Sequence, residues 1–181
     1  MGMYEIKSSE DYRRFMNGIS GFVKRLNHEY ILPEHVLFLL SEHTRIRALL
    51  EACGADLFRL KKDLEHFFAH KVEKVPGISP AGSISFNRIM SAANYKVVSA
   101  QKKLIDILDI LVALFEEENS HAVFFLKKQG IDSFEIIKAV SSGAYNPDEF
   151  HEAPEPTVDS SDEERRDLKK EVRKTKFLQQ F

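Results

Sequence analysis

Histidines at helical spacing are the residues of this sequence most suited to chemistry. His66 and His70, in the stretch HFFAH, are four residues apart, so one face of a helix would carry both imidazoles, where they could hold a metal ion. The glutamate of a His-Glu-x-x-His zinc motif is missing, and the sequence assigns no third ligand. We therefore interpret both as solvated surface residues and predict no metal site. A metal-dependent helical enzyme remains the alternative.

Three further histidines lie earlier in the chain. His35 and His43 are eight residues apart with apolar residues between them, and we expect His35 to be a hydrogen-bonded structural residue. His28 and Glu29 lie in a loop before the stretch PEHVLFLL and are expected to be exposed. The sole cysteine, Cys53, rules out an intramolecular disulfide and is expected to be a small buried core residue.

Several functional classes find no support in the sequence. It contains no Gly-x-x-x-x-Gly-Lys-Ser/Thr loop and no supported Ser-His-Asp set, so we predict a chain that is not an enzyme and holds no cofactor. A net charge of −2 gives no reason to expect nucleic acid or an anionic membrane as a partner. No apolar run approaches the ~18 residues of a membrane span, and the first residues lack the apolar core of a signal peptide. We predict a cytoplasmic protein.

Helical periodicity dominates the elements that must carry these residues. In DLFRLKKDLEHFF the apolar residues recur three or four positions apart, and SFNRIMSAANYKVV repeats the pattern. No Asn-Gly or Asp-Gly hairpin signal separates alternating strands. The sequence predicts an all-α fold with about eight helices before Gly143.

The boundaries of these helices are marked by residues with capping chemistry. Pro33 suits the first position of a helix, and Gly54 suits the left-handed residue that follows a helix end. Asp56 can accept the free N–H groups that begin the next helix, and Asp106 marks a later start in the same way. Two prolines and two glycines make 74–83 a loop.

The composition changes after about residue 145. The stretch YNPDEFHEAPEPTVDSSDEE holds three prolines, many carboxylates and few large apolar residues. The sequence therefore predicts a compact domain over 1–145 and a flexible, charged, disordered linker over 146–181 that leads toward an absent module.

An internal repeat relates the two halves of the compact domain. Gly54 aligns with Gly130 and Asp56 with Asp132 at an offset of 76, while 31–42 aligns with 105–116 at an offset of 74. Both copies read as a capped short helix, a short helix that ends in glycine, and a helix that begins with aspartate. We predict a pseudo-two-fold pair of four-helix repeats, at about 8–75 and 84–143.

The stretches HEYILPEHVLFLL, LEACGADL, SISFNRIMSAA, DILVALFEEENSHAVFFLKKQGID and VSSG resemble the N-terminal domain of the Clp ATPases, which is a double Clp-N repeat. Their details favour the ClpA type of this AAA+ unfoldase and chaperone family, and the resemblance covers about 11–143. Leu32 departs from the pattern, because the family usually has Thr or Ser there, so we expect that helix start to rely on Pro33 alone.

This resemblance implies a binding domain that receives a ClpS adaptor and protein substrates and passes them to a hexameric motor and the ClpP peptidase. ATP and magnesium would belong to the absent ATPase modules, and the isolated domain is expected to be a monomer. The family's adaptor contacts fall on Glu29, Glu34 and Ser83, to which we add the neighbouring His28. Two alternatives stay open: ordinary helix-start chemistry for Glu34 and Ser83, and a stand-alone Clp-N protein that modulates the motor or the peptidase.

Overall fold

The computed structural model describes residues 5–144, so the predicted linker lies outside the described residues. Within 5–144 the chain forms eight helices, which confirms the all-α prediction, together with four strands of two residues each. The helices are α1 (Glu10–Arg25), α2 (Pro33–Glu42), α3 (Thr44–Ala52), α4 (Leu57–His70), α5 (Ile84–Ser99), α6 (Ile107–Leu114), α7 (His121–Lys128) and α8 (Ser133–Ser141). The strands are β1 (Lys7–Ser8), β2 (Tyr30–Ile31), β3 (Ala81–Gly82) and β4 (Leu104–Ile105).

Five of the eight helices in residues 5–144 begin at short polar side chains that accept a hydrogen bond from the first turn. As the sequence predicts, Asp56 caps α4 by accepting from the N–H of Arg59, and Asp132 caps α8 by accepting from the N–H of Glu135. Ser120 caps α7 in the same way. These contacts are local in sequence, which is why they can be read from it.

Two helix starts carry contacts that the sequence does not predict. Asp106 is the N-cap residue of α6, as predicted, but its carboxylate also engages Ser9 and Arg45, and Asp109 accepts from the N–H of Asp106 at 2.8 Å. The start of α2 does not rely on proline alone, because Nδ1 of His35 accepts from the N–H of Leu32 at 2.9 Å. In both repeats the third helical residue therefore reaches back to the residue before the helix.

The two glycines that the repeat aligns both adopt left-handed backbone conformations. Gly54 has φ +91° and Gly130 has φ +78°, each directly after a short helix. A residue with a Cβ is strained at such angles. The structure therefore confirms the predicted helix ends after α3 and α7.

We expect Gly54→Val to lower the free energy of unfolding by about 1–3 kcal/mol, because valine is disfavoured at positive φ. Chemical denaturation measures the change. Gly18→Val is the matched control: Gly18 lies within α1, a Cβ there would have nothing within 4 Å, and valine is a better helix former than glycine. Equal stabilities of the two variants would contradict the assignment of strain to Gly54.

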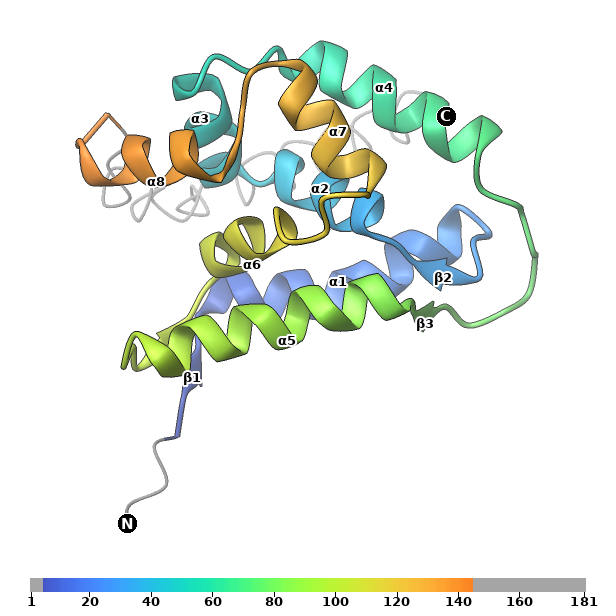
Figure 1. Ribbon diagram of the computed structural model, residues 1–181. Coiled ribbons are helices and arrows are strands. Elements are labelled where there is room, and N and C mark those ends of the chain that lie inside the picture. Colours follow the sequence, from blue (N-terminus) through green and yellow to red (C-terminus); the bar gives the residue numbers. More distant parts are fainter. Residues whose placement is uncertain (1–4, 145–181) are drawn as a thin grey trace, which may run out of the picture. The chain divides into compact units, whose positions relative to one another are not determined.

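The four strands pair across the two repeats. β1 pairs in parallel with β4, and β2 pairs in parallel with β3, as Figure 1 shows for the second pair at the start of α5. β3 lies within 74–83, which the sequence predicts as a loop, so the second repeat begins at Ala81 and each repeat contributes one strand to each pair. The hydrogen bonds are equivalent at the predicted offset of 74: Lys7 N–H donates to the carbonyl of Lys103, and Ala81 N–H donates to the carbonyl of Glu29. The two strand pairs are therefore related by the predicted pseudo-two-fold axis.

The core lies around α2 and α6, the first short helix of each repeat. α2 contacts α1, α3, α4, α5, α6 and α7, and Val36, Leu37 and Leu40 have no exposed surface. Cys53 differs from the prediction of a buried core residue: it is half-buried, with its Sγ 3.6 Å from the carbonyl of Glu135. Burial, with a contribution from Glu135, raises the pKa of the Cys53 thiol.

Candidate functional site

The pairing of β2 with β3 brings together two of the four predicted adaptor-binding residues. Glu29 precedes β2 and Ser83 follows β3, and both are half-buried. Large apolar side chains lie beside them: Tyr30 is 48% exposed and Ile84 is 73% exposed. We call Glu29, Tyr30, Ala81, Gly82, Ser83 and Ile84 the β2–β3 surface.

Local chemistry fixes the β3 side of this surface. Ser83 caps α5, because its Oγ accepts a hydrogen bond from the N–H of Phe86 at 3.0 Å. A Cβ on Gly82 would lie 2.8 Å from Oδ1 of Asn87 and 2.9 Å from the ring of Phe86, so β3 approaches α5 more closely than another residue would allow. Ser83 thus acts as a helix cap, which was one of the two alternatives for this residue. Its side chain is still half-buried, so its hydroxyl lies at the edge of the β2–β3 surface.

His28 is not exposed, contrary to the sequence prediction: only 1% of its surface is accessible. Its Nδ1 lies 2.8 Å from Nε2 of His35, and its ring also donates a hydrogen bond to the backbone carbonyl of Phe68. Because Leu32 N–H donates to Nδ1 of His35, the proton of that imidazole belongs on Nε2, from which it is donated to His28. We call His28 and His35 the histidine pair.

Both members of the histidine pair are neutral at physiological pH. Burial, followed by the proximity of His28, lowers the pKa of His35 to about 3, and burial together with Lys74 lowers the pKa of His28. The expectation of a structural, hydrogen-bonded role for His35 is confirmed. The pair holds the loop that carries Glu29 against α4.

In the second repeat an ion pair takes the place of the histidine pair in the corresponding loop. Lys102 and Asp109, at an offset of 74 from His28 and His35, form an ion pair. Asn27 and Gln101, one residue earlier in each loop, both have positive φ, at 57° and 53°. The sequence contained this signal, because the 74-residue alignment sets the histidines opposite a complementary charged pair.

Glu34 is also buried, with 3% of its surface accessible. Its Oε1 accepts a hydrogen bond from the N–H of Ala122, 3.2 Å away in the first turn of α7. The carboxylate therefore lies at the positive end of a helix in the other repeat. Glu34 links the two repeats and presents almost no surface to a partner in this structure.

A second polar cluster, which sequence reasoning missed, lies near β1 and β4. The guanidinium of Arg45 is 2.8 Å from Asp11 and 2.9 Å from Asp106, and His43 is 3.2 Å from Asp11. Ser9 Oγ donates to Asp106. We call these five residues the Arg45 cluster. It joins α1, α3 and the start of α6, and no spacing in the sequence connects residues so far apart.

Burial alone would raise the pKa values of both carboxyl groups in the Arg45 cluster. Hydrogen bonds outweigh it: those from Arg45 and His43 hold the pKa of Asp11 below its ordinary value, and those from Ser9 and Arg45 do the same for Asp106. Both are therefore carboxylates at neutral pH. The exposed fraction of the side chain ranges from 11% for Arg45 to 29% for His43, with Asp106 and Asp11 between them. The Arg45 cluster therefore stabilises the fold from a partly buried position.

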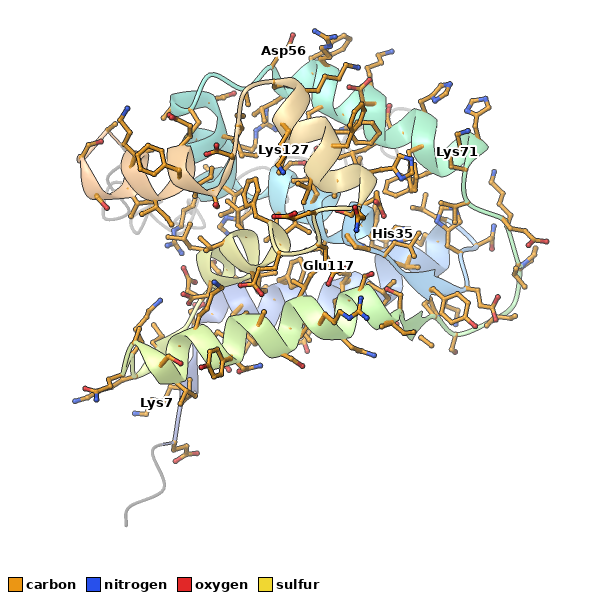
Figure 2. The ribbon with its side chains drawn as sticks, in the orientation of Figure 1. Lys7, His35, Asp56, Lys71, Glu117 and Lys127 are labelled. Carbon is orange, nitrogen blue, oxygen red and sulfur yellow. The ribbon has the colours of Figure 1, made fainter. Side chains whose placement is uncertain are left out.

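A groove of about 780 Å³ begins at Ile84 and runs between α5 and the turn from α6 to α7. Arg88 lies on one wall and Glu116, Glu117 and Glu118 lie on the other; Figure 2 shows Glu117 on this turn, next to α5. Two of these carboxylates have partners, since Glu116 pairs with Lys96 at 2.7 Å and Glu117 lies 4.0 Å from Arg88. The groove thus extends the β2–β3 surface with acidic side chains.

Among residues 5–144 no group of three or more His, Cys, Asp or Glu side chains is placed to hold a metal ion. His66 and His70 are exposed on α4, with ring centroids 4.2 Å apart, and Nδ1 of His70 lies 2.9 Å from the carbonyl of His66. Over the same described residues, no helix combines the length and the apolar character that crossing a membrane would require.

The fold is thus a helical module of two repeats with a surface of mixed polar and apolar side chains, and comparison with known proteins identifies its class. Residues 7–129 match the family described as the Clp repeat (R) N-terminal domain. The chain belongs to this Clp-N family. The predicted resemblance to the N-terminal domain of the Clp AAA+ unfoldases is confirmed.

Individual relatives agree with this family. A ClpA homolog protein from Fuscovulum blasticum is 27% identical over 130 residues, which cover 70% of this chain and 16% of that protein. The Hsp104 N-terminal domain from Candida albicans has the same fold, with a TM-score of 0.66 at 15% identity over 77% of this chain and 93% of that one. The N-terminal domain of the ClpV1 ATPase from E. coli gives a TM-score of 0.62 at 18% identity, over 75% and 85%.

Proposed function

We propose that this chain is the docking domain of a ClpA-like ATPase, which receives protein substrates and a ClpS-like adaptor in the cytoplasm for delivery to a ClpP-like peptidase. Clp-N domains bind substrates and adaptors and are not catalytic, which agrees with a chain that is not an enzyme. Because the matched segment is 16% of the ClpA homolog, ATP hydrolysis, magnesium binding and hexamer formation would belong to other parts of such a protein.

The observation that carries the proposal is the juxtaposition of Glu29 and Ser83 by the β2–β3 pairing. They are 54 positions apart in the chain, yet the N–H of Ala81 donates to the carbonyl of Glu29 at 3.0 Å, and the N–H of Ser83 donates to the carbonyl of Ile31 at 3.2 Å. Two of the three residues that the family resemblance assigns to one interface therefore share one surface.

The chemistry of this surface suits a partner with basic or hydrogen-bond-donating groups around an apolar centre. Tyr30 and Ile84 offer exposed apolar area, which supplies affinity when it is buried. Glu29, and the carboxylates of the adjoining groove, supply orientation and exclude acidic partners.

His28 and Glu34 are buried and lie on either side of β2 in the chain, where their contacts hold that segment in place. His28 belongs to the histidine pair under the loop that ends in Glu29, and Glu34 fixes the start of α2 to α7. We assign both residues to positioning, with Glu29 and Ser83 as the contacts. A variant at Glu34 would then weaken binding through loss of stability.

We expect Glu29→Lys to weaken binding of a ClpS-like adaptor at least about tenfold, because a lysine there opposes the basic groups of the partner. Isothermal titration calorimetry with the cognate adaptor measures the affinity. The loss of affinity with added salt should also become smaller or reverse, since an attractive charged contact is replaced by a repulsive one that salt screens.

Glu51→Lys is the matched control for this experiment. It makes the same change of charge at an exposed position of α3, which Figure 1 places far from β2 and β3. We expect it to retain the affinity of the unaltered chain. If both variants lose the same affinity, the effect comes from net charge and not from a contact at Glu29. If the unaltered chain gives no heat of binding with the adaptor, the proposal is rejected.

A further inference from the structure

The outward face of α5 carries an apolar stripe, of which the proposed function uses only Ile84, at its first residue. One side of α5 is buried, with Phe86, Ile89, Ala93 and Val97 in the core. On the opposite side five exposed residues recur four, three, four and three positions apart, which keeps them in line along the helix. They are Ile84, Arg88, Ser91, Tyr95 and Val98, and we call them the α5 stripe.

The exposure of this stripe is large for apolar side chains. Ile84 and Tyr95 are each 73% exposed, and Val98 is 59% exposed. α5 contains no aspartate or glutamate in its 16 residues. A helix face that only meets water normally carries charges of both signs, so this face has the composition of an interface.

The first repeat provides an internal comparison. At the offset of 74, the α5 stripe corresponds to five residues on α1: Glu10, Arg14, Asn17, Gly21 and Lys24. Glu10 and Arg14 form an ion pair there, and the face is polar throughout. Two helices with equivalent positions in the fold therefore differ in this one respect, and only the α5 face is apolar.

We propose that the α5 stripe is the interface for a second copy of this chain, with the two α5 helices packed antiparallel about a two-fold axis at Ser91. The stripe is nearly palindromic. Ser91 would face itself at the axis, and Ile84, seven residues before it, would face Val98, seven residues after it. A two-fold interface requires this kind of self-complementarity, since each patch meets its own copy.

Charge also favours a second copy. Arg88 lies three residues before Ser91 and Tyr95 four residues after it, so each guanidinium would pack on the ring of the other copy in a cation–π contact. The two arginines would lie roughly 10 Å apart along the axis, which limits their repulsion. α5 itself contributes no carboxylate to this face, and of the carboxylates on the neighbouring turn Glu116 and Glu117 already have cationic partners in Lys96 and Arg88.

The flanks of the stripe allow the helices to approach closely. On one side lie Ser85, Ala92 and Ser99, three small residues seven positions apart. On the other side lie Asn87 and Asn94, both exposed, whose amides would meet across the axis and can pair with each other. The residues of each flank, like those of the α5 stripe, read nearly the same in both directions along the helix, as an antiparallel two-fold pair requires.

The size of the contact predicts a weak dimer. A helix of 16 residues is about 24 Å long, and two such helices bury less total area than the ~1,200 Å² at which standard interfaces begin. We therefore expect a dissociation constant of roughly ten to several hundred micromolar. A weak dimer departs from the monomer that we expect from the family resemblance. The dimer proposal is independent of whether Glu29 and Ser83 bind an adaptor.

Cysteine cross-linking of the 181-residue chain tests the axis directly. In a Cys53→Ser background, Ser91→Cys should form a disulfide dimer under oxidised glutathione, because antiparallel helices about 8–10 Å apart bring the two Cα atoms within disulfide range. Asn17→Cys, the equivalent exposed position on α1, is the control. We expect Ser91→Cys to cross-link at least about tenfold faster, owing to the raised effective concentration. Equal rates would overturn the proposal.

Sedimentation at several concentrations tests the pairing within the stripe. Ile84→Lys with Val98→Lys sets like charges against each other and should abolish any concentration-dependent rise in mass. Ile84→Glu with Val98→Lys sets opposite charges against each other only in the antiparallel arrangement, and should restore the rise. A monomer at all concentrations for the unaltered chain, or the same association in both double variants, would contradict a second copy on this face.

Discussion

Replacing Arg45 by methionine should lower the free energy of unfolding by about 3–5 kcal/mol, the largest effect that we expect from a single substitution in this chain. Arg45 contacts both Asp11 and Asp106, and its loss leaves two partly buried carboxylates without their shared cation. Urea denaturation at neutral pH measures the change. Arg47→Met, at an exposed position of the same helix, should change stability by less than about 0.5 kcal/mol.

The cause of the Arg45 effect can be separated from loss of packing. If uncompensated charge is responsible, adding Asp11→Asn and Asp106→Asn to Arg45→Met should recover at least about half of the lost stability, because neutral amides need no cation. Both carboxyl groups have pKa values below their ordinary range in the folded chain. Their stabilisation is thus present above pH ~4 and is lost as pH falls further, and Arg45→Met should flatten that acid limb. A triple variant no more stable than Arg45→Met would contradict this account.

Acidification from pH 6.5 to pH 4.5 should cost about 2–3 kcal/mol of stability through His35. Its pKa is about 3 in the folded chain and ordinary, near 6.5, in the unfolded chain. Between these values the unfolded chain binds more protons, so stability is full above pH 6.5 and falls as pH falls. His28 adds to the same trend, because its pKa is lowered too.

His35→Gln tests this prediction, since a glutamine carbonyl can accept from Leu32 N–H and its amide can donate to His28. The variant should show a smaller fall in stability between pH 6.5 and pH 4.5. His66→Gln, which removes an exposed histidine from α4, should leave the slope unchanged. Identical slopes in all three chains would show that His35 does not carry the effect. This window lies above the one in which Asp11 and Asp106 titrate.

The helix ends were predictable because they depend on residues close together in sequence. Gly54 and Asp56 act within one turn, and the repeat at 130 and 132 confirmed their assignment through a second copy. The expectation that Glu29 and Ser83 belong to one surface came only from the family resemblance. Periodicity and capping alone do not show that β2 and β3 pair.

The errors have a common physical origin. Burial of His28 depends on Phe68, which is 40 positions away, and the engagement of Asp106 depends on Arg45, which is 61 positions away. Local rules correctly place His28 in a loop and Asp106 at the start of α6, but they do not show the long-range contacts that bury His28 and engage the Asp106 carboxylate. The alignment of His28 and His35 with Lys102 and Asp109 was the one sequence feature that could have revealed the histidine pair.

The exchanged strands also determine how this domain can come apart. β1 is held by β4 and β2 by β3, so neither four-helix repeat contains a complete strand pair of its own. Opening either repeat removes a partner from the other, and the first described strand is released only when contacts almost a hundred residues away are broken. The two repeats should therefore unfold together as one cooperative unit, with no stable half-domain left behind for a protease.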